Sequence, residues 1–200
     1  MPRSGVAKRE YVGTAVFRGD KMVGFLDSMQ TRLFLMVAGK YNRGTMSFED
    51  PNVAEESIVV DLRLGRRPKI KASFDQEDRP IVDVKINLEA DIDAIQSRIN
   101  YESTKMIDQL NNHIENEIKE GISKTIEKTQ KELASDIFEF GNYFAGYFTD
   151  IDAWEKYNWL SHYPKAKVNV DVDVNIRRTG LMIYSAPVKS GQSNDNASGE

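Results

Sequence analysis

Apolar and polar residues alternate along several stretches of the chain, which is the pattern of β-strands with one buried face. The first stretch spans residues 11–17, and the tripeptide Arg18-Gly19-Asp20 separates it from a second, Lys21–Leu26. Two short strands joined by a glycine-containing turn form a hairpin. We therefore predict a β-hairpin near the start of the chain and a third short strand at residues 45–48.

Longer alternating stretches follow at residues 58–64, 70–74, 82–90 and 168–176. Gly65 and Pro68 interrupt the first two of these, and both residue types mark a bulge or a sharp bend in a strand. Strands with one wet and one buried face are typical of antiparallel sheets, whereas buried parallel strands are apolar throughout. We predict an antiparallel sheet with one face open to solvent.

Elsewhere the apolar period is helical. Asp27 or Ser28 can cap a short helix that ends at Gly39. Apolar residues recur every four positions from Met106 to Ile126, which predicts a long helix over about residues 101–135. Steps of four residues overshoot a helical turn by about 40° each, so the apolar stripe winds around the helix axis. Such a stripe fits a helix that lies diagonally across a twisted sheet.

A second helix is predicted to begin at Ser135-Asp136, with Phe140, Phe144 and Phe148 on its buried side. Together these elements predict an α+β fold: an antiparallel β-sheet with a long amphipathic helix packed on one face, plus shorter helices. We divide the chain into an N-terminal extension at residues 1–10, one domain at residues 11–188 and a disordered, Ser/Gly/Asn-rich tail at residues 189–200.

Composition narrows the classes of function. The 200 residues are 40% hydrophobic, carry a net charge of −4 and include no cysteine. Nucleic-acid binders usually have a basic excess, and without cysteine there are no disulfides, thiolate metal sites or cysteine nucleophiles. The longest apolar run, Leu33–Ala38, is far shorter than the roughly 20 residues that span a bilayer, and no signal peptide is recognisable. We expect the chain as given to be soluble.

Candidate catalytic chemistry is sparse. The two histidines, His113 and His162, lie on different predicted elements, and no nucleophile elbow, phosphate-binding glycine loop or zinc-binding helix motif is present. Acidic residues of the predicted strands share one sheet face if their strands are neighbours, where they either bind calcium or form a solvated face with Lys85 and Arg177. We prefer the solvated face, and we expect no metal and no cofactor. These acidic residues are Asp83, Glu89, Asp91, Asp171 and Asp173.

Aromatic residues point to a binding surface. Ten of the nineteen lie between Phe138 and Tyr163. Tyr and Trp are favoured where an apolar ring meets a polar environment, at interfaces and membrane surfaces. Packing onto the long helix accounts for part of this cluster, and we take the rest as a candidate interaction surface. Its aromatic members are Tyr143, Tyr147, Trp154, Tyr157 and Trp159.

Basic residues are densest between Arg63 and Lys71. Such a stretch fits either a solvated strand edge, where cations discourage edge pairing, or attraction to an anionic membrane. We favour the strand edge.

Three stretches together resemble one protein family. Residues 13–26, GTAVFRGDKMVGFL, resemble its opening hairpin, residues 135–141, SDIFEFG, the start of its second helix, and residues 168–180, VNVDVDVNIRRTG, its closing strand. The family is Ger(x)C, the lipoprotein C subunit of bacterial nutrient germinant receptors, and the resemblance is to its C-terminal domain. The doublet Arg177-Arg178 belongs to this pattern, so we add both arginines to the candidate interaction surface.

The resemblance implies a role in spore germination. Subunits of this family are tethered through a lipidated N-terminal cysteine to the outer face of the spore inner membrane. There they join a transporter-like and a channel-like membrane subunit in a complex that responds to nutrients. No catalytic residues are known for the family. Its signal peptide, lipid-bearing cysteine and N-terminal domains are missing here, so we expect an excised C-terminal domain or a truncated relative without its own anchor.

We therefore predict a non-catalytic subunit domain of a spore nutrient germinant receptor. It would be needed for the germinant response and would contact the partner membrane subunits, but no nucleic acid. Two alternatives stay open. One is a small-ligand domain that senses the nutrient itself, with aromatic residues lining a pocket. The other is a cell-wall or carbohydrate-active enzyme that uses carboxylates such as Glu102 or Asp150, which would have to lie in a cleft about 5–9.5 Å apart.

Overall fold

The computed structural model describes residues 13–97, 99–101 and 103–179, the side chains of residues 178 and 179 excepted. The predicted N-terminal extension and the predicted tail lie outside these residues. Along the chain the elements are β1 (Thr14–Arg18), β2 (Lys21–Leu26), α1 (Ser28–Val37), β3 (Arg43–Glu49), β4 (Ser57–Phe74), β5 (Pro80–Ile95), α2 (Thr104–Lys131), the 3-10 helices η1 (Phe140–Tyr143) and η2 (Ala145–Tyr147), α3 (Ile151–Tyr157), α4 (Trp159–His162), η3 (Tyr163–Lys165) and β6 (Lys167–Thr179).

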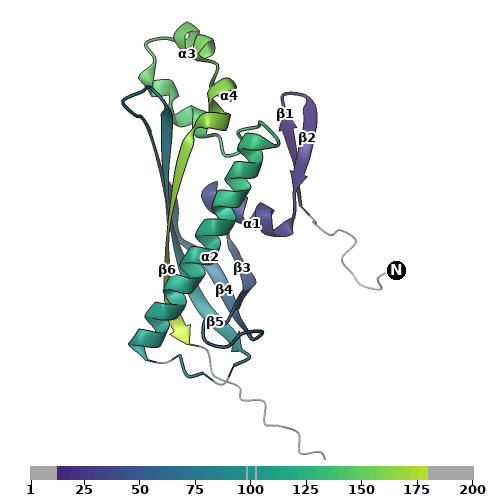
Figure 1. The fold of residues 1–200 in the computed structure, drawn as a ribbon, viewed down its shortest axis with the longest axis vertical. Coiled ribbons are helices and arrows are strands. Elements are labelled where there is room, and N and C mark those ends of the chain that lie inside the picture. Colours follow the sequence, from purple (N-terminus) through teal and green to yellow (C-terminus); the bar gives the residue numbers. More distant parts are fainter. Residues whose placement is uncertain (1–12, 98, 102, 180–200) are drawn as a thin grey trace, which may run out of the picture.

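The fold class is α+β, as predicted, with α2 packed on one face of a four-stranded sheet (Figure 1). The strand order is β3-β4-β5-β6, and the first two pairs are antiparallel. The prediction of an antiparallel sheet is wrong for the last strand, because β6 runs parallel to β5, with Val84 opposite Val170. Alternation along a strand reports one wet and one buried face, and it carries no information about the direction of the neighbouring strand.

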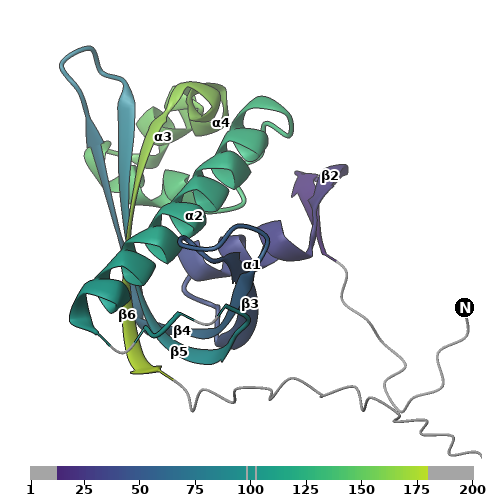
Figure 2. The ribbon, with the colours of Figure 1, turned by 60° about the horizontal axis from the view of Figure 1, so that its bottom comes forward.

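The two central strands are much longer than the edge strand β3, which pairs with β4 only as far as Arg63. The ladder between β4 and β5 shifts register between Leu64 and Arg66 and again between Arg66 and Lys69. This confirms the interruption predicted at Gly65 and Pro68, where we expected a bulge or a sharp bend. Beyond it, β4 and β5 continue past β3 as a long hairpin (Figure 2), and β6 accompanies β5 as far as Ile81.

Helix α2 crosses the sheet diagonally, as the winding apolar stripe predicted (Figure 1). Its stripe is buried against the sheet, with Ile114, Ile118 and Ile122 at most 1% exposed. The helix begins after Ser103, whose side chain accepts a hydrogen bond from the Met106 amide. None of the helices in the described residues is long and apolar enough to cross a membrane.

The first hairpin stands apart from the main sheet. Strands β1 and β2 form their own two-stranded sheet, which is connected to α1 and lies near the C-terminal end of α2 (Figures 1 and 2). Val16 and Leu26 pack with Leu133 in a small second core. Helix α1 follows with the predicted cap, since Asp27 and Gln30 form a reciprocal capping box. It ends at Val37, and Gly39, just after the capping residue Ala38, adopts a left-handed φ of 69°.

The second helix predicted from Ser135-Asp136 is wrong. The chain there has no α-helix and instead forms η1 and η2, because Ala134 and Glu139 adopt left-handed φ angles of 46° and 59°. A spacing of three or four residues between aromatic side chains fits tight 3-10 turns as well as an α-helix. The aromatic spacing therefore did not distinguish between these two structures. We call residues 138–163 the aromatic cap; it covers one end of the sheet and of α2 (Figure 1).

Candidate functional site

The predicted interaction surface is divided by the fold. Trp159 belongs to the core, with 7% of its surface exposed, and its ring stacks on Phe144 at a centroid distance of 4.7 Å. Its indole Nε1 donates to Asp136 Oδ2 at 2.7 Å, and the Gly141 amide donates to the same oxygen at 2.8 Å. Trp159 therefore anchors the aromatic cap to the body of the domain and is not available as a contact surface.

Asp136 is a half-buried acid just before the aromatic cap. Burial raises the pKa of its carboxyl, although the hydrogen bonds from Gly141 and Trp159 oppose the shift. The other oxygen, Oδ1, is buried and has no hydrogen-bond partner among the described residues. The hydrogen bond from Trp159 to this carboxylate fixes the position of the indole.

Trp154 and Tyr157 are half-buried on α3. Tyr157 stacks on His162 at 4.1 Å and meets Phe74 of β4 edge-on at 6.0 Å. Burial raises the pKa of Tyr157, whose hydroxyl is buried without a partner in the described part of the chain. These rings hold the cap against the tip of the β4–β5 hairpin and expose only part of their surface.

Tyr143 and Tyr147 remain on the surface, with 43% and 58% of their area exposed. Tyr147 donates its hydroxyl to the carbonyl of Ala72 at 2.7 Å. Ala72 lies on the part of β4 that β3 does not reach, since β3 pairs with β4 only as far as Arg63. Tyr147 therefore attaches the aromatic cap to the backbone of β4 on this stretch of the strand.

Tyr143 borders a groove of about 240 Å³ between the end of α1, the bend of β4 and the start of the aromatic cap. We call it the α1–β4 groove. It is lined by Phe34, Val37, Ala38, Gly39, Lys40, Arg67, Pro68, Ile70, Ile137, Phe138, Glu139, Asn142 and Tyr143.

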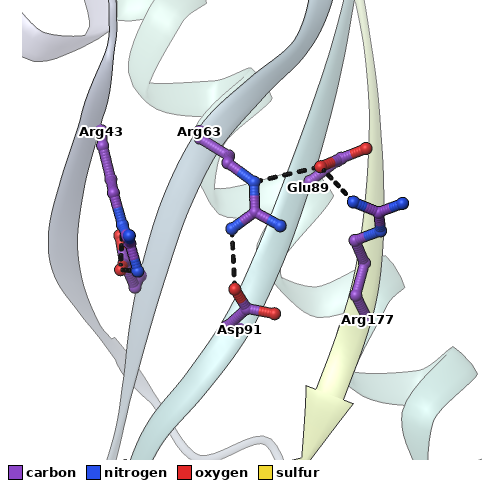
Figure 3. A network of polar contacts seen from close by, with 6 residues as sticks. Arg43, Arg63, Glu89, Asp91 and Arg177 are labelled. Atoms are coloured by element: carbon purple, nitrogen blue, oxygen red, sulfur yellow. Dashed lines mark hydrogen bonds and ion pairs between the residues drawn. The ribbon is translucent and has the colours of Figure 1, made fainter.

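Arg177 lies near the end of β6, on the solvent-facing side of the sheet and not on the side covered by α2 (Figure 3). Its guanidinium donates to Glu89 Oε2 at 2.9 Å. The same oxygen accepts from Arg63 Nε at 3.0 Å, and Arg63 also reaches Asp91 at 2.7 Å. Arg178 continues β6, and its side chain lies outside the described residues. The arginine and the tyrosines of the predicted surface therefore lie on different faces of the domain.

The acidic residues of this sheet face bind neighbouring side chains rather than one another. Lys85 donates to Asp171 at 2.8 Å, Asn169 donates to Asp83 at 2.7 Å, and the Asn87 amide contacts Asp173. Within the described residues no group of three or more His, Asp or Glu side chains could hold a metal ion. The cross-strand pairs agree with the solvated face that we preferred over a calcium site.

The carboxylate and histidine candidates for catalysis have local structural partners. Asp150 caps α3 by accepting from the Ala153 amide at 2.8 Å, and this bond together with one from Thr149 lowers the pKa of Asp150. His113 lies on α2 with its Nε2 2.8 Å from both the Glu49 carbonyl and Glu117. Glu102 lies outside the described residues.

The first hairpin carries an exposed apolar surface that we did not predict. Phe17, Met22 and Phe25 are 53%, 52% and 63% exposed. Phe17 is opposite Met22, and Phe25 is opposite Ala15, so these side chains share the face that points away from the small core of Val16 and Leu26. Apolar residues at every position from Ala15 to Phe17 were the available signal, since a half-wet strand should alternate. We call this face the hairpin surface.

Comparisons with known proteins agree with this fold. The model of a family described as "Spore germination B3/GerAC like, C-terminal" matches residues 12–180. A crystal structure of the GerBC protein superimposes with a TM-score of 0.71 at 20% sequence identity, over 84% of this chain and 52% of that protein. The chain thus spans about half the length of that relative. No curated protein matches.

Proposed function

The chain belongs to the spore germination B3/GerAC-like C-terminal family, and from this premise we propose that it is a non-catalytic domain of the C subunit of a spore nutrient germinant receptor. In the full-length subunit a lipid anchor outside this chain would hold the domain at the outer face of the spore inner membrane. The domain would present a protein-binding surface to the transporter-like and channel-like membrane subunits of the same receptor.

The hairpin surface is the observation that carries the partner contact. Three large apolar side chains, Phe17, Met22 and Phe25, are more than half exposed on one face of a hairpin that projects from the body (Figure 2). Aromatic residues, Met and Arg are enriched in protein interfaces, and Arg18 lies at the turn of the same hairpin. Burying a side chain such as Phe25 in a partner contributes about 2 kcal/mol, which is typical of the residues that dominate an interface.

A non-catalytic role is supported by the structural roles of the polar residues, which bind neighbouring groups in the fold. Asp150 caps a helix, Asp136 positions Trp159, and the sheet-face carboxylates neutralise Arg63, Lys85 and Arg177. Each of these groups has a structural partner that accounts for its presence. The predicted surface at Tyr143, Tyr147 and Arg177-Arg178 stays a second proposal for partner contact.

The test uses the full-length subunit in spores. We expect Met22→Ser combined with Phe25→Ser to abolish copurification of the membrane subunits and to slow nutrient-triggered germination strongly, with the subunit at its normal level on immunoblots. The matched control is Ile151→Ser with Leu160→Ser in the aromatic cap, two apolar residues that are 71% and 45% exposed.

Two results would contradict the proposal. One is normal germination and normal copurification in the hairpin variant. The other is normal germination after deletion of residues 12–180 from the full-length subunit, which would show that the domain has no part in the nutrient response. Loss of copurification in both the hairpin variant and the cap variant would place the contact on a wider surface that includes the cap.

A further inference from the structure

The α1–β4 groove is lined by apolar, polar and charged side chains, and we call its two cations, Lys40 and Arg67, the cationic rim. The apolar side chains belong to the core and its periphery, among them Phe34, Ile70 and Phe138. Lys40 follows the end of α1, and Arg67 lies in the bend of β4, so two cations from different elements reach the same groove. Tyr143 and Asn142 add polar groups from the aromatic cap.

The cations of the rim differ from those of the outer sheet face in their partners. In the described part of the chain neither Lys40 nor Arg67 forms an ion pair, whereas Arg43, Arg63 and Arg177 on the outer sheet face each have a carboxylate. One acidic residue, Glu139, lines the groove, and its carboxylate contacts Asn142. The rim therefore has an excess of positive charge in a chain whose net charge is −4.

The bend of β4 and the turn of α1 hold the two sides of the groove in place. Gly39 has a φ of 69°, and a Cβ built on it would lie 3.2 Å from Pro68 Cδ and 3.6 Å from Arg67 Cγ. The backbone of α1 therefore approaches the β4 bulge closely, which a larger residue would prevent. Lys40 directly follows Gly39 and Arg67 directly precedes Pro68, so this contact brings both cations to the same groove.

We propose that the α1–β4 groove binds a small carboxylate with an apolar body. The apolar part would lie on Phe34, Ile70 and Phe138, and the carboxylate would accept hydrogen bonds from Lys40 and Arg67. An arginine beside a lysine suits a carboxylate, since guanidinium binds it with paired N–H donors. A volume of about 240 Å³ lies below the 300–1,000 Å³ of drug-sized ligand sites, so the ligand is no larger than one aromatic or branched acid.

Two sources supply this chemistry: a free carboxylic acid, or the C-terminal carboxylate of a partner polypeptide that ends in an apolar residue. Both kinds of ligand present a carboxylate that is joined to an apolar group. The site is independent of the hairpin surface, and it goes beyond the proposed receptor contact.

The test is an NMR titration of the purified chain with 3-phenylpropionate, using 3-phenyl-1-propanol and 3-phenylpropylamine as matched neutral and cationic probes. We expect a dissociation constant in the millimolar range for the acid, with backbone shifts centred on Lys40, Arg67 and Tyr143. The alcohol should bind about tenfold more weakly and the amine should not bind. The peptide Gly-Ala-Phe with a free C-terminus, compared with its C-terminal amide, tests the second source.

Three variants make the result specific. Lys40→Met with Arg67→Met should weaken binding of the acid about tenfold. Asn142→Trp should block the mouth of the groove, and because Asn142 is exposed this variant should keep its fold. Lys69→Met, an exposed cation of β4 that does not line the groove, should bind like the wild type. Equal affinity for the acid and the amine, shifts outside the groove, or unchanged affinity in the Lys40/Arg67 variant would overturn the proposal, whatever the outcome of the germination experiments.

Discussion

Arg177 and Glu89 form an ion pair across the parallel strands β6 and β5, with Arg177 Nη1 2.9 Å from Glu89 Oε2 (Figure 3). The same carboxylate oxygen accepts a hydrogen bond from Arg63 of β4 on its other side. Glu89 therefore connects three neighbouring strands on the solvent-facing side of the sheet. The two arginines offset the negative charge that Glu89 would otherwise add to this sheet face.

Replacing Glu89 tests the strength of this connection. Glu89→Gln keeps the side-chain shape but leaves two guanidinium groups without their shared charge. We expect a decrease in Tm of about 1–3 °C in low salt, because exposed ion pairs are weak and become stronger only in networks. The loss should nearly vanish in 1 M NaCl, where the charges are screened. Glu120→Gln, which loses a single i,i+4 contact with Lys124 on α2, is the control and should change Tm less.

Asp50 anchors the loop after β3 through its buried carboxylate. It accepts hydrogen bonds from Ser97 Oγ at 2.5 Å, the Tyr101 hydroxyl at 2.6 Å and the Asn52 amide at 2.8 Å. Burial alone would raise the pKa of Asp50, but these hydrogen bonds together outweigh it and the pKa is lowered. The ionised carboxylate is therefore the form that stabilises the folded state.

We expect Asp50→Asn to lower the free energy of unfolding by about 2 kcal/mol at pH 7. The native pKa lies below the unfolded value near 4, so this contribution is complete above that value and is lost as the pH falls through the native pKa. Urea unfolding of both proteins between pH 7 and pH 2 should show the gap closing below about pH 4. A gap that stays constant down to pH 2 would mean that the carboxylate charge is unimportant.

Tyr101 makes the complementary prediction at high pH. Burial, and then its hydrogen bond to Asp50, raise the pKa of Tyr101 to about 12. Because the folded state favours the neutral phenol, its contribution is complete below the unfolded pKa near 10 and is lost as the pH rises from 10 to 12. The Tyr101→Phe variant cannot ionise there, so its stability should fall less steeply between pH 10 and pH 12. Parallel curves for the two proteins in alkaline unfolding would contradict this account.

Two glycines of the aromatic cap should respond differently to replacement by alanine. A Cβ on Gly141 would lie 2.5 Å from Trp159 Cδ1, whereas nothing lies within 4 Å of one on Gly146. We expect Gly141→Ala to cost about 1–3 kcal/mol by overpacking and to alter Trp159 fluorescence as the indole moves from Asp136. Gly146→Ala should leave both properties unchanged. An unaltered emission spectrum in Gly141→Ala would show that Trp159 is less tightly held than its contacts indicate.

Two isoleucines test whether the stripe of α2 is the core of the domain. Ile118, on the buried side of α2, is 1% exposed, while Ile151 on α3 is 71% exposed. Ile118→Ala should lower the free energy of unfolding by about 3 kcal/mol through lost burial and the remaining cavity. Ile151→Ala should change it by no more than about 0.5 kcal/mol. Similar values for both variants in denaturant titrations would contradict the observed packing of α2.

The candidate site could be predicted only in part. The aromatic cluster was visible in the sequence, but whether Trp159 packs inward and Tyr147 outward depends on the turns of η1 and η2, which follow from left-handed φ angles at Ala134 and Glu139. The α1–β4 groove is built from three segments distant in sequence. No local pattern places Lys40 beside Arg67, because that approach depends on how α1 docks at the bend of β4.

Elements whose signal is local could be predicted from the order of residues. Asp27 and Gly39 bound α1, the four-residue isoleucine steps define α2 and its diagonal course, and alternation defines the wet and buried faces of β4, β5 and β6. These features depend on residues one to four positions apart, which any single stretch of chain contains. The tertiary structure alone decided the parallel direction of β6, the exposure of Phe17, Met22 and Phe25, and the meeting of Glu89 with Arg177. Each of these depends on which elements lie side by side, and burial and charge pairing are energies between segments far apart in the chain.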